Sequence, residues 1–202
     1  MTTRWIRSAL SVCFVLSHLA PAFAQSTPER FELGAQFAVI RSSEFEAADL
    51  GAGARFSWMP NGLLGLESEI NFYPKGFPSV FPFSSGRTEG LFGATVGPKV
   101  GAVRPFAKGR AGLLNISGTS QSFVCALIFP PLLACELASG RTLPAFDFGG
   151  GFELLTQRTF ARLEIGDRLI RYPGPVIAKS GIQDNSFFSH DLRLAAGAGL
   201  RF

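Results

Sequence analysis

The segment Asp191–Phe202 alternates between two kinds of side chain without a single interruption. One kind is apolar and the other is small or charged: Leu192, Leu194, Ala196, Ala198, Leu200 and Phe202 against Asp191, Arg193, Ala195, Gly197, Gly199 and Arg201. Successive side chains point to opposite faces of a β-strand, so a period of two predicts a strand with one apolar face.

Seven further segments show the same alternation. Together with Asp191–Phe202 they are Phe31–Arg41, Asp49–Met59, Leu63–Tyr73, Thr88–Gly101, Arg104–Ile116, Leu143–Thr156 and Thr159–Arg168. Each is about long enough to cross a bilayer at a tilt, which takes about 9–11 residues, and bacterial single-chain barrels have an even number of strands. We therefore predict an all-β fold, an eight-stranded antiparallel up-and-down transmembrane β-barrel.

The connections between these segments alternate in length. Those after the second, fourth and sixth segments are tiny: Pro60-Asn61-Gly62, Ala102-Val103 and Gln157-Arg158. The Asn-Gly pair suits a tight hairpin, and the other connections are long and irregular. Outer-membrane barrels have short periplasmic turns and long extracellular loops, so we expect both chain ends in the periplasm.

The first 24 residues have the features of an export signal. Arg4 and Arg7 precede an apolar run, and Ala22-Phe23-Ala24 is a small-x-small cleavage pattern. We expect cleavage after Ala24, which leaves one barrel domain over residues 25–202. The formal net charge then falls from +4 to +2, with acids and bases interleaved along the strands, so we expect no nucleic-acid partner.

Sorting the strands by parity places nearly all strand charges on the face opposite Phe56, Phe148 and Leu194. This arrangement is the inverse of a soluble lipocalin-like barrel, whose charges face outward. The interior of an eight-stranded barrel is filled by side chains, so the inward charges must be paired. The predicted ion-pair network of the lumen comprises Glu32, Arg55, Glu67, Glu69, Lys99, Lys108, Arg110, Asp147, Glu153, Arg162, Glu164, Arg168, Asp191, Arg193 and Arg201.

The sequence resembles the small outer-membrane β-barrel family of OmpX and the OmpA transmembrane domain. The resemblance is sharpest in three stretches: Phe92–Gly97, Arg104–Gly112 and the terminal Leu200–Phe202. The resemblance is diffuse and extends over residues 25–202. It implies that the terminal aromatic residue belongs to a signal recognised by the outer-membrane assembly machinery. The residues that carry this implied assembly signal are Ala198, Leu200 and Phe202.

Two cysteines remain once Cys13 leaves with the export signal. Cys125 and Cys135 form an even pair in an oxidising compartment, so we expect a disulfide around Pro130-Pro131, the alternative being two reduced, buried thiols. His190 is the only histidine after residue 24, and we expect no metal and no cofactor.

Enzymes occur on small barrels, and two pairs of residues in this sequence bear on catalysis. Ser189 and His190 are adjacent in a strand and point to opposite faces, which argues against a dyad and favours an interfacial histidine. Glu67 and Glu69 share a face, and the neighbouring arginines favour ion pairs over acid–base chemistry.

The long connections contain apolar clusters. The second long connection, which follows Tyr73, holds Phe77, Phe81 and Phe83. The third long connection, which follows Ile116, holds Phe123, Ile128, Phe129 and Leu132. Such clusters either cap the barrel mouth or contact lipopolysaccharide or a protein partner; hydrophobic solute uptake is a further alternative.

The sequence thus predicts a monomeric outer-membrane barrel with a charge-plugged lumen and a structural or surface-interaction role without catalysis. Its expected partners are outer-membrane lipid, lipopolysaccharide and the assembly machinery. A narrow channel for small solutes and a lipid A-modifying enzyme are the alternatives.

Overall fold

The computed structural model describes residues 31–45, 48–74, 86–118 and 128–202. Eight long strands form the body: β1 (Phe31–Ser42), β2 (Ala48–Trp58), β3 (Leu64–Tyr73), β4 (Arg87–Val96), β5 (Val103–Ile116), β6 (Arg141–Leu155), β7 (Thr159–Tyr172) and β10 (Phe187–Arg201). Three short elements accompany them: α2 (Leu133–Ala138), β8 (Val176–Ala178) and β9 (Gly181–Gln183).

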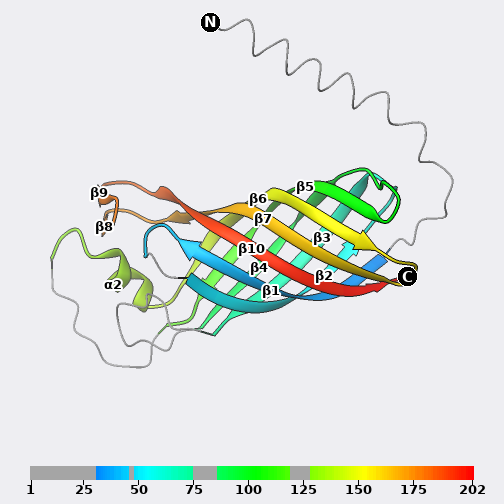
Figure 1. Ribbon diagram of the computed structural model, residues 1–202. Helices are drawn as coiled ribbons and strands as arrows, with labels where there is room; N and C mark the ends of the chain where they lie inside the picture. The colour runs from blue at the N-terminus through cyan, green and yellow to red at the C-terminus, as the bar shows by residue number, and fades with distance from the viewer. Residues whose placement is uncertain (1–30, 46–47, 75–85, 119–127) are drawn as a thin grey trace, which may run out of the picture.

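The eight long strands close into one antiparallel barrel in the order β1-β10-β7-β6-β5-β4-β3-β2 (Figure 1). Chain neighbours are neighbours in space, and β10 closes the barrel by pairing with β1. The predicted fold class, an eight-stranded antiparallel up-and-down barrel, is confirmed.

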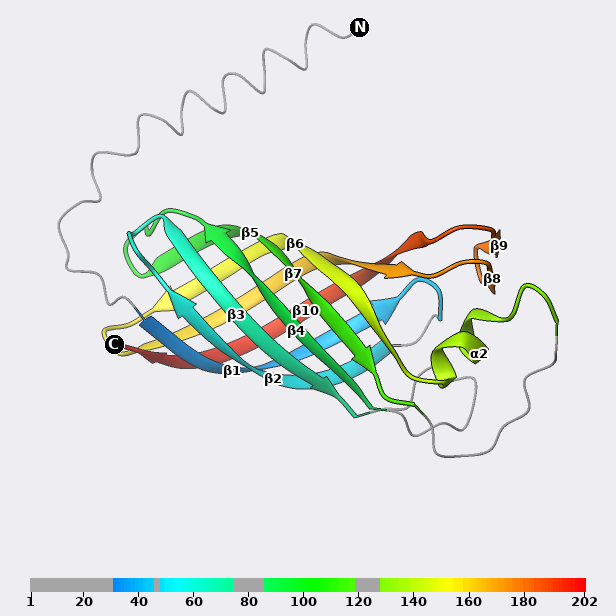
Figure 2. The same ribbon diagram turned by 180° about the vertical axis from the view of Figure 1, so that it is seen from behind.

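The register of the strands fixes the tilt of the barrel. One row of paired residues starts at Glu32, passes through Ser57, Glu67, Gly93, Arg110, Asp147, Arg168 and Asp191, and returns to β1 at Ser42. The row therefore returns ten residues along β1 from its start, which is the stagger that closure of a tilted barrel requires. Figure 2 shows this tilt from behind.

The side chains are inverted relative to a soluble protein. Phe37 is 65% exposed and Leu163 is 64% exposed on the outer surface, whereas Glu67 and Arg168 are fully buried. Outward apolar and inward charged residues alternate along each long strand, as the parity of the sequence predicts. No helix among the described residues is long and apolar enough to cross a membrane.

One end of the barrel carries the start of β1, the end of β10 and the short turns. Asn61 caps the turn between β2 and β3, because its Oδ1 accepts hydrogen bonds from the backbone N–H groups of Leu63 (3.0 Å) and Leu64 (2.7 Å). Phe31 stacks against Phe56 and Phe202 on the outer surface nearby, with ring centroids 6.0 and 6.1 Å apart. We call this the terminal end.

The opposite end, here called the loop end, carries α2 and the β8–β9 hairpin (Figures 1 and 2). Leu133 and Leu137 of α2 are buried in an apolar cluster with inward residues at the ends of β4 to β7 and with Val176 of β8. We call this cluster the stopper. Its buried members are Leu91, Leu114, Ile116, Leu133, Leu137, Leu143, Ala145, Ile170, Tyr172 and Val176.

Candidate functional site: the ion-paired lumen

The pleat of the strands positions the lumen side chains, because every second residue of each long strand points inward. Glycines on the same face leave room for the long ones. A Cβ on Gly166 would lie 2.8 Å from Asp147 Oδ1 and 3.3 Å from Lys108 Cε, so a larger residue would collide with two members of the network. Gly166 thus leaves room for the long side chains beside it.

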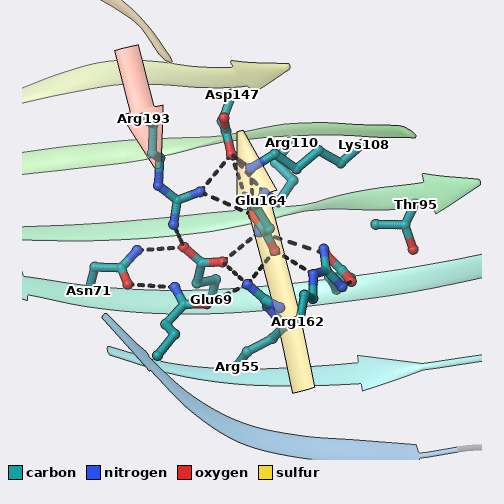
Figure 3. A network of polar contacts seen from close by, with 12 residues as sticks. Arg55, Glu69, Asn71, Thr95, Lys108, Arg110, Asp147, Arg162, Glu164 and Arg193 are labelled. Atoms are coloured by element: carbon teal, nitrogen blue, oxygen red, sulfur yellow. Dashed lines mark hydrogen bonds and ion pairs between the residues drawn. The ribbon is translucent and has the colours of Figure 1, made fainter. Parts of the chain in front are cut away.

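Arg110 of β5 lies at the centre of the network. Its guanidinium contacts Glu69 of β3 at 2.5 Å, Asp147 of β6 at 2.5 Å and Glu164 of β7 at 2.9 Å. Figure 3 shows these carboxylates converging on it from three other strands. One cation therefore joins four strands across the lumen.

The same three carboxylates are shared with other cations. Lys108 contacts Asp147 at 2.9 Å and Glu164 at 2.6 Å, and Arg193 contacts Asp147 at 2.8 Å as well as Glu69 (Figure 3). Each carboxylate has two or more positive neighbours, which offsets the cost of removing its charge from water.

Arg55 of β2 completes this central group. Its guanidinium lies 3.2 Å from Glu69 and 2.5 Å from Glu164. Gln36 accepts a hydrogen bond from Arg55 and donates one to Asn71 at 2.7 Å, so neutral amides extend the network to β1.

Towards the terminal end the pairs continue. Arg162 of β7 binds Glu67 of β3 in a bidentate arrangement and contacts Glu153 at 2.7 Å, and its guanidinium lies 3.9 Å from the centre of the Phe106 ring. Arg104 contacts Glu153 at 3.0 Å. Arg201 pairs with Glu32 at 2.8 Å, beside the seam between β10 and β1.

Towards the loop end, Arg168 of β7 bridges Glu89 of β4 at 2.8 Å and Asp191 of β10 at 2.6 Å. Arg87 pairs with Asp49 at 2.5 Å. The stopper lies alongside these pairs, since Leu114 is opposite Glu89 across β4 and β5. Ile170 and Tyr172 follow Arg168 on the inward face of β7. Apolar side chains thus border the charged part of the lumen at this end.

The inward charges balance. Nine acidic and nine basic side chains are buried among the described residues: Glu32, Asp49, Glu67, Glu69, Glu89, Asp147, Glu153, Glu164 and Asp191 against Arg55, Arg87, Arg104, Lys108, Arg110, Arg162, Arg168, Arg193 and Arg201. Because β3 and β7 lie opposite each other in the closed sheet, the pair of Glu67 and Arg162 spans the full width of the lumen.

The structure places every predicted network residue among these buried charges except Lys99. The prediction that Lys99 belongs to the lumen network was wrong. β4 ends at Val96, and Lys99 lies half-buried in the connection to β5, without an ion pair to any described residue. The prediction also missed Asp49, Arg87, Glu89 and Arg104. Their parity was the signal that would have found them, because each extends the inward row of its strand toward an end.

The other predicted site residues have these positions. Ala198, Leu200 and Phe202 face outward, and Phe202 exchanges backbone hydrogen bonds of 2.9 and 3.0 Å with Phe31. Phe77, Phe81, Phe83, Phe123 and Cys125 lie outside the described residues. Leu132 precedes α2 and pairs with Ile177, while Ile128 and Phe129 are exposed. Cys135 lies on α2, and the disulfide stays a prediction.

Ser189 and His190 point to opposite faces. Ser189 is 2% exposed and donates to Asp191 inside the barrel, whereas the His190 side chain is 67% exposed and contacts Asp167 on the outside. No group of metal-binding side chains occurs in the part of the chain that the structure describes.

No family model and no curated protein matches the chain. Among solved structures it is similar to Neisserial surface protein A, with a TM-score of 0.54 and 15% identity over 85% of this chain and 97% of that one. Ail, the attachment invasion locus protein of Yersinia pestis, is also similar, with a TM-score of 0.46 and 14% identity over 86% of this chain and 98% of that one.

The chain has the fold of a small outer-membrane β-barrel, as its resemblance to the OmpA and OmpX family implies. At this identity the likeness to solved structures concerns the fold.

Proposed function

We propose that this protein is a closed outer-membrane barrel with a structural or surface-interaction role and no catalytic turnover. The observation that carries the proposal is the set of buried ion pairs that cross the lumen between distant strands. Arg162 to Glu67, Arg193 to Glu69 and Arg168 to Glu89 each join strands three or four positions apart in the closed sheet.

A continuous water path would require several of these pairs to separate together. Removing one partner from a buried pair costs roughly 3–5 kcal/mol, and the pairs here share carboxylates, so opening one disturbs its neighbours. The stopper adds an apolar layer at the loop end. Both features favour a closed lumen over a narrow channel.

The outer surface supports placement in a bacterial outer membrane. Exposed apolar side chains cover the barrel wall, and an aromatic cluster of Phe31, Phe56 and Phe202 lies at the terminal end. Aromatic girdles mark the membrane boundaries of such barrels, and short turns mark the periplasmic side. We therefore assign the terminal end to the periplasm, with Phe202 presented to the assembly machinery, and treat the barrel as a monomer.

The loop end then faces outward from the cell and carries the interaction surface. Leu133 and Leu137 are buried in the stopper, whereas the side chains of Phe129 and Ile128 are 86% and 45% exposed. The third connection thus has an inner part that caps the mouth and an outer part that is available to a partner.

The test is conductance of the purified protein in planar bilayers. We expect no discrete current steps from the wild type, while insertion is verified by heat-dependent gel migration. A charge-neutral variant, Glu67→Ser with Arg162→Ser, removes a pair that spans the lumen and should leak ions, whereas Arg158→Ser removes an exposed arginine and should stay closed. Current steps in the wild type as large as those of the double variant would contradict a closed lumen.

The absence of turnover is tested separately. The outward His190 and inward Ser189 are separated by the barrel wall, so they cannot act on one substrate. Mass spectra of lipid A from cells with and without the protein should be identical, and a new lipid species would refute the non-enzymatic role.

A further inference from the structure

The outer surface near the loop end carries an unusual group of polar residues, here called the rim patch: Arg41, Asp167, Arg171 and His190. All four side chains are exposed on the outside of β1, β10 and β7. Elsewhere on these strands the outward residues are almost all apolar or small. The rim patch therefore interrupts an apolar wall.

The register brings these residues together. Arg41, Leu192 and Asp167 occupy one row across β1, β10 and β7. His190 pairs with Leu169 in the next outward row, and Arg171 pairs with Phe188 in the row beyond. Outward residues in neighbouring rows of adjacent strands lie within reach of long side chains, so the rim patch is one contiguous group.

Asp167 is unusual because its carboxylate lies among exposed apolar side chains on the outer wall. Its row also contains the exposed Phe148, and Ile165 precedes it on the same face. A carboxylate at the upper edge of an apolar wall requires a partner. His190 supplies it, with Nδ1 2.7 Å from Asp167 Oδ2. This contact orients the ring and directs Nε2 away from Asp167.

The two rim-patch residues outside the Asp167–His190 contact, Arg41 and Arg171, are both positively charged. Arg41 has no ion pair with any described residue, and Arg171 donates only to the hydroxyl of Ser186, at 2.9 and 3.3 Å. The rim patch thus contains one carboxylate, which His190 contacts, and two arginines in the rows on either side of His190. Guanidinium groups bind phosphate oxygens in a bidentate manner, so the excess charge complements an anionic phosphate.

Apolar side chains border the rim patch. The ring centroids of Phe188 and Phe146 lie 6.3 Å apart. Three exposed apolar residues, Leu192, Leu194 and Ile165, continue the wall toward the terminal end. A ligand bound here meets cations at its head and an apolar surface below, which is the chemistry of a phosphorylated lipid standing beside the barrel.

We propose that the rim patch binds the phosphate group of an anionic lipid in the leaflet at the loop end, with Arg41 and Arg171 as phosphate ligands and His190 held in place by Asp167. This inference rests on the membrane placement proposed above. It adds a defined lipid site to a barrel whose buried interior charges pair with one another.

The test measures lipid selectivity with spin-labelled phosphatidylglycerol and phosphatidylcholine around the full barrel in phosphatidylcholine bilayers. The wild type should retain the anionic label preferentially in its motionally restricted shell. Arg41→Gln and Arg171→Gln should each reduce its relative association constant about fivefold, since a cation near a membrane surface contributes about that factor. Arg158→Gln, on the turn between β6 and β7, removes the same charge at the terminal end and should have little effect.

Two results would overturn the proposal. Equal losses in Arg41→Gln, Arg171→Gln and Arg158→Gln would mean diffuse attraction with no site, and an unselective wild type would mean no binding. Insertion of every variant is monitored by heat-dependent gel migration, which reports on the barrel and not on lipid selectivity. Failure to insert would therefore contradict the membrane placement, whereas loss of selectivity in an inserted barrel concerns the rim patch alone.

Discussion

Replacing Arg110 by methionine tests the lumen network at its centre. The substitution keeps an elongated side chain and removes the cation that contacts Glu69, Asp147 and Glu164 within 2.9 Å. Those carboxylates stay buried, so the variant loses attraction without recovering hydration. Removing one partner of a buried ion pair costs roughly 3–5 kcal/mol.

The expected magnitude lies at the lower end of that range. Lys108 and Arg193 still contact Asp147 at 2.9 and 2.8 Å, so no carboxylate is left without a cation. We expect a loss of about 3 kcal/mol, or about a hundredfold in the unfolding equilibrium constant. Adding Asp147→Leu removes one of the carboxylates that has lost a cation, so the double variant should lose less than the two single losses combined, by about 1 kcal/mol or more.

Urea titration in phospholipid vesicles measures these changes. Trp58 is the only tryptophan after residue 24 and lies on the outer surface, where its fluorescence reports insertion. The matched control Arg158→Met removes an exposed arginine and should change stability by no more than about 0.5 kcal/mol. The reasoning fails if Arg110→Met is no more destabilised than this control, or if the Asp147 double variant is additive.

Three further predictions concern the outer wall, the seam and the cysteines. Phe148→Arg should cost about 2–4 kcal/mol in the same titration if its outward side chain meets hydrocarbon, and a neutral effect would place it outside the membrane. Deleting Phe202 removes two backbone hydrogen bonds to Phe31 and a ring contact, so the yield of inserted barrel should fall while export continues; normal insertion would argue against an assembly role. Non-reducing mass mapping should find Cys125 linked to Cys135, and free thiols at both positions would disprove the disulfide.

The barrel was predictable because strand parity is a local property. Each segment needs only its own alternation to assign an inside and an outside, and the short connections then fix an up-and-down order. The assignment failed where parity was carried past the end of a strand. Lys99 has the inward parity of Leu91, Gly93 and Thr95, yet β4 ends at Val96 and the backbone after it belongs to a connection.

The partners within the lumen could not be predicted. A pair such as Glu67 and Arg162 joins strands on opposite sides of the barrel, and its formation depends on the ten-residue stagger of the closed sheet. No single strand contains that information, because the stagger is a sum over all eight strand pairs. Parity predicts which charges face inward, and closure decides which of them meet.

The stopper was equally hidden, because it combines residues from four strands with the short helix α2 and with β8. The third long connection was expected to cap the mouth or to contact a partner, and its described residues include both the buried Leu133 and Leu137 and the exposed Ile128 and Phe129.

The balance of charge inside the barrel has a consequence for its surface. Among the described residues nine inward acids are matched by nine inward bases, so these side chains give the lumen no net charge with which to attract a ligand. A network whose positive and negative charges cancel produces little electrostatic field outside the barrel. Long-range attraction must then come from outward charges, and on the wall near the loop end these are Arg41, Asp167, Arg171 and His190, with an excess of cations. This division of charge is consistent with the proposals above, in which the interior stabilises the barrel and the rim patch and loops bind partners.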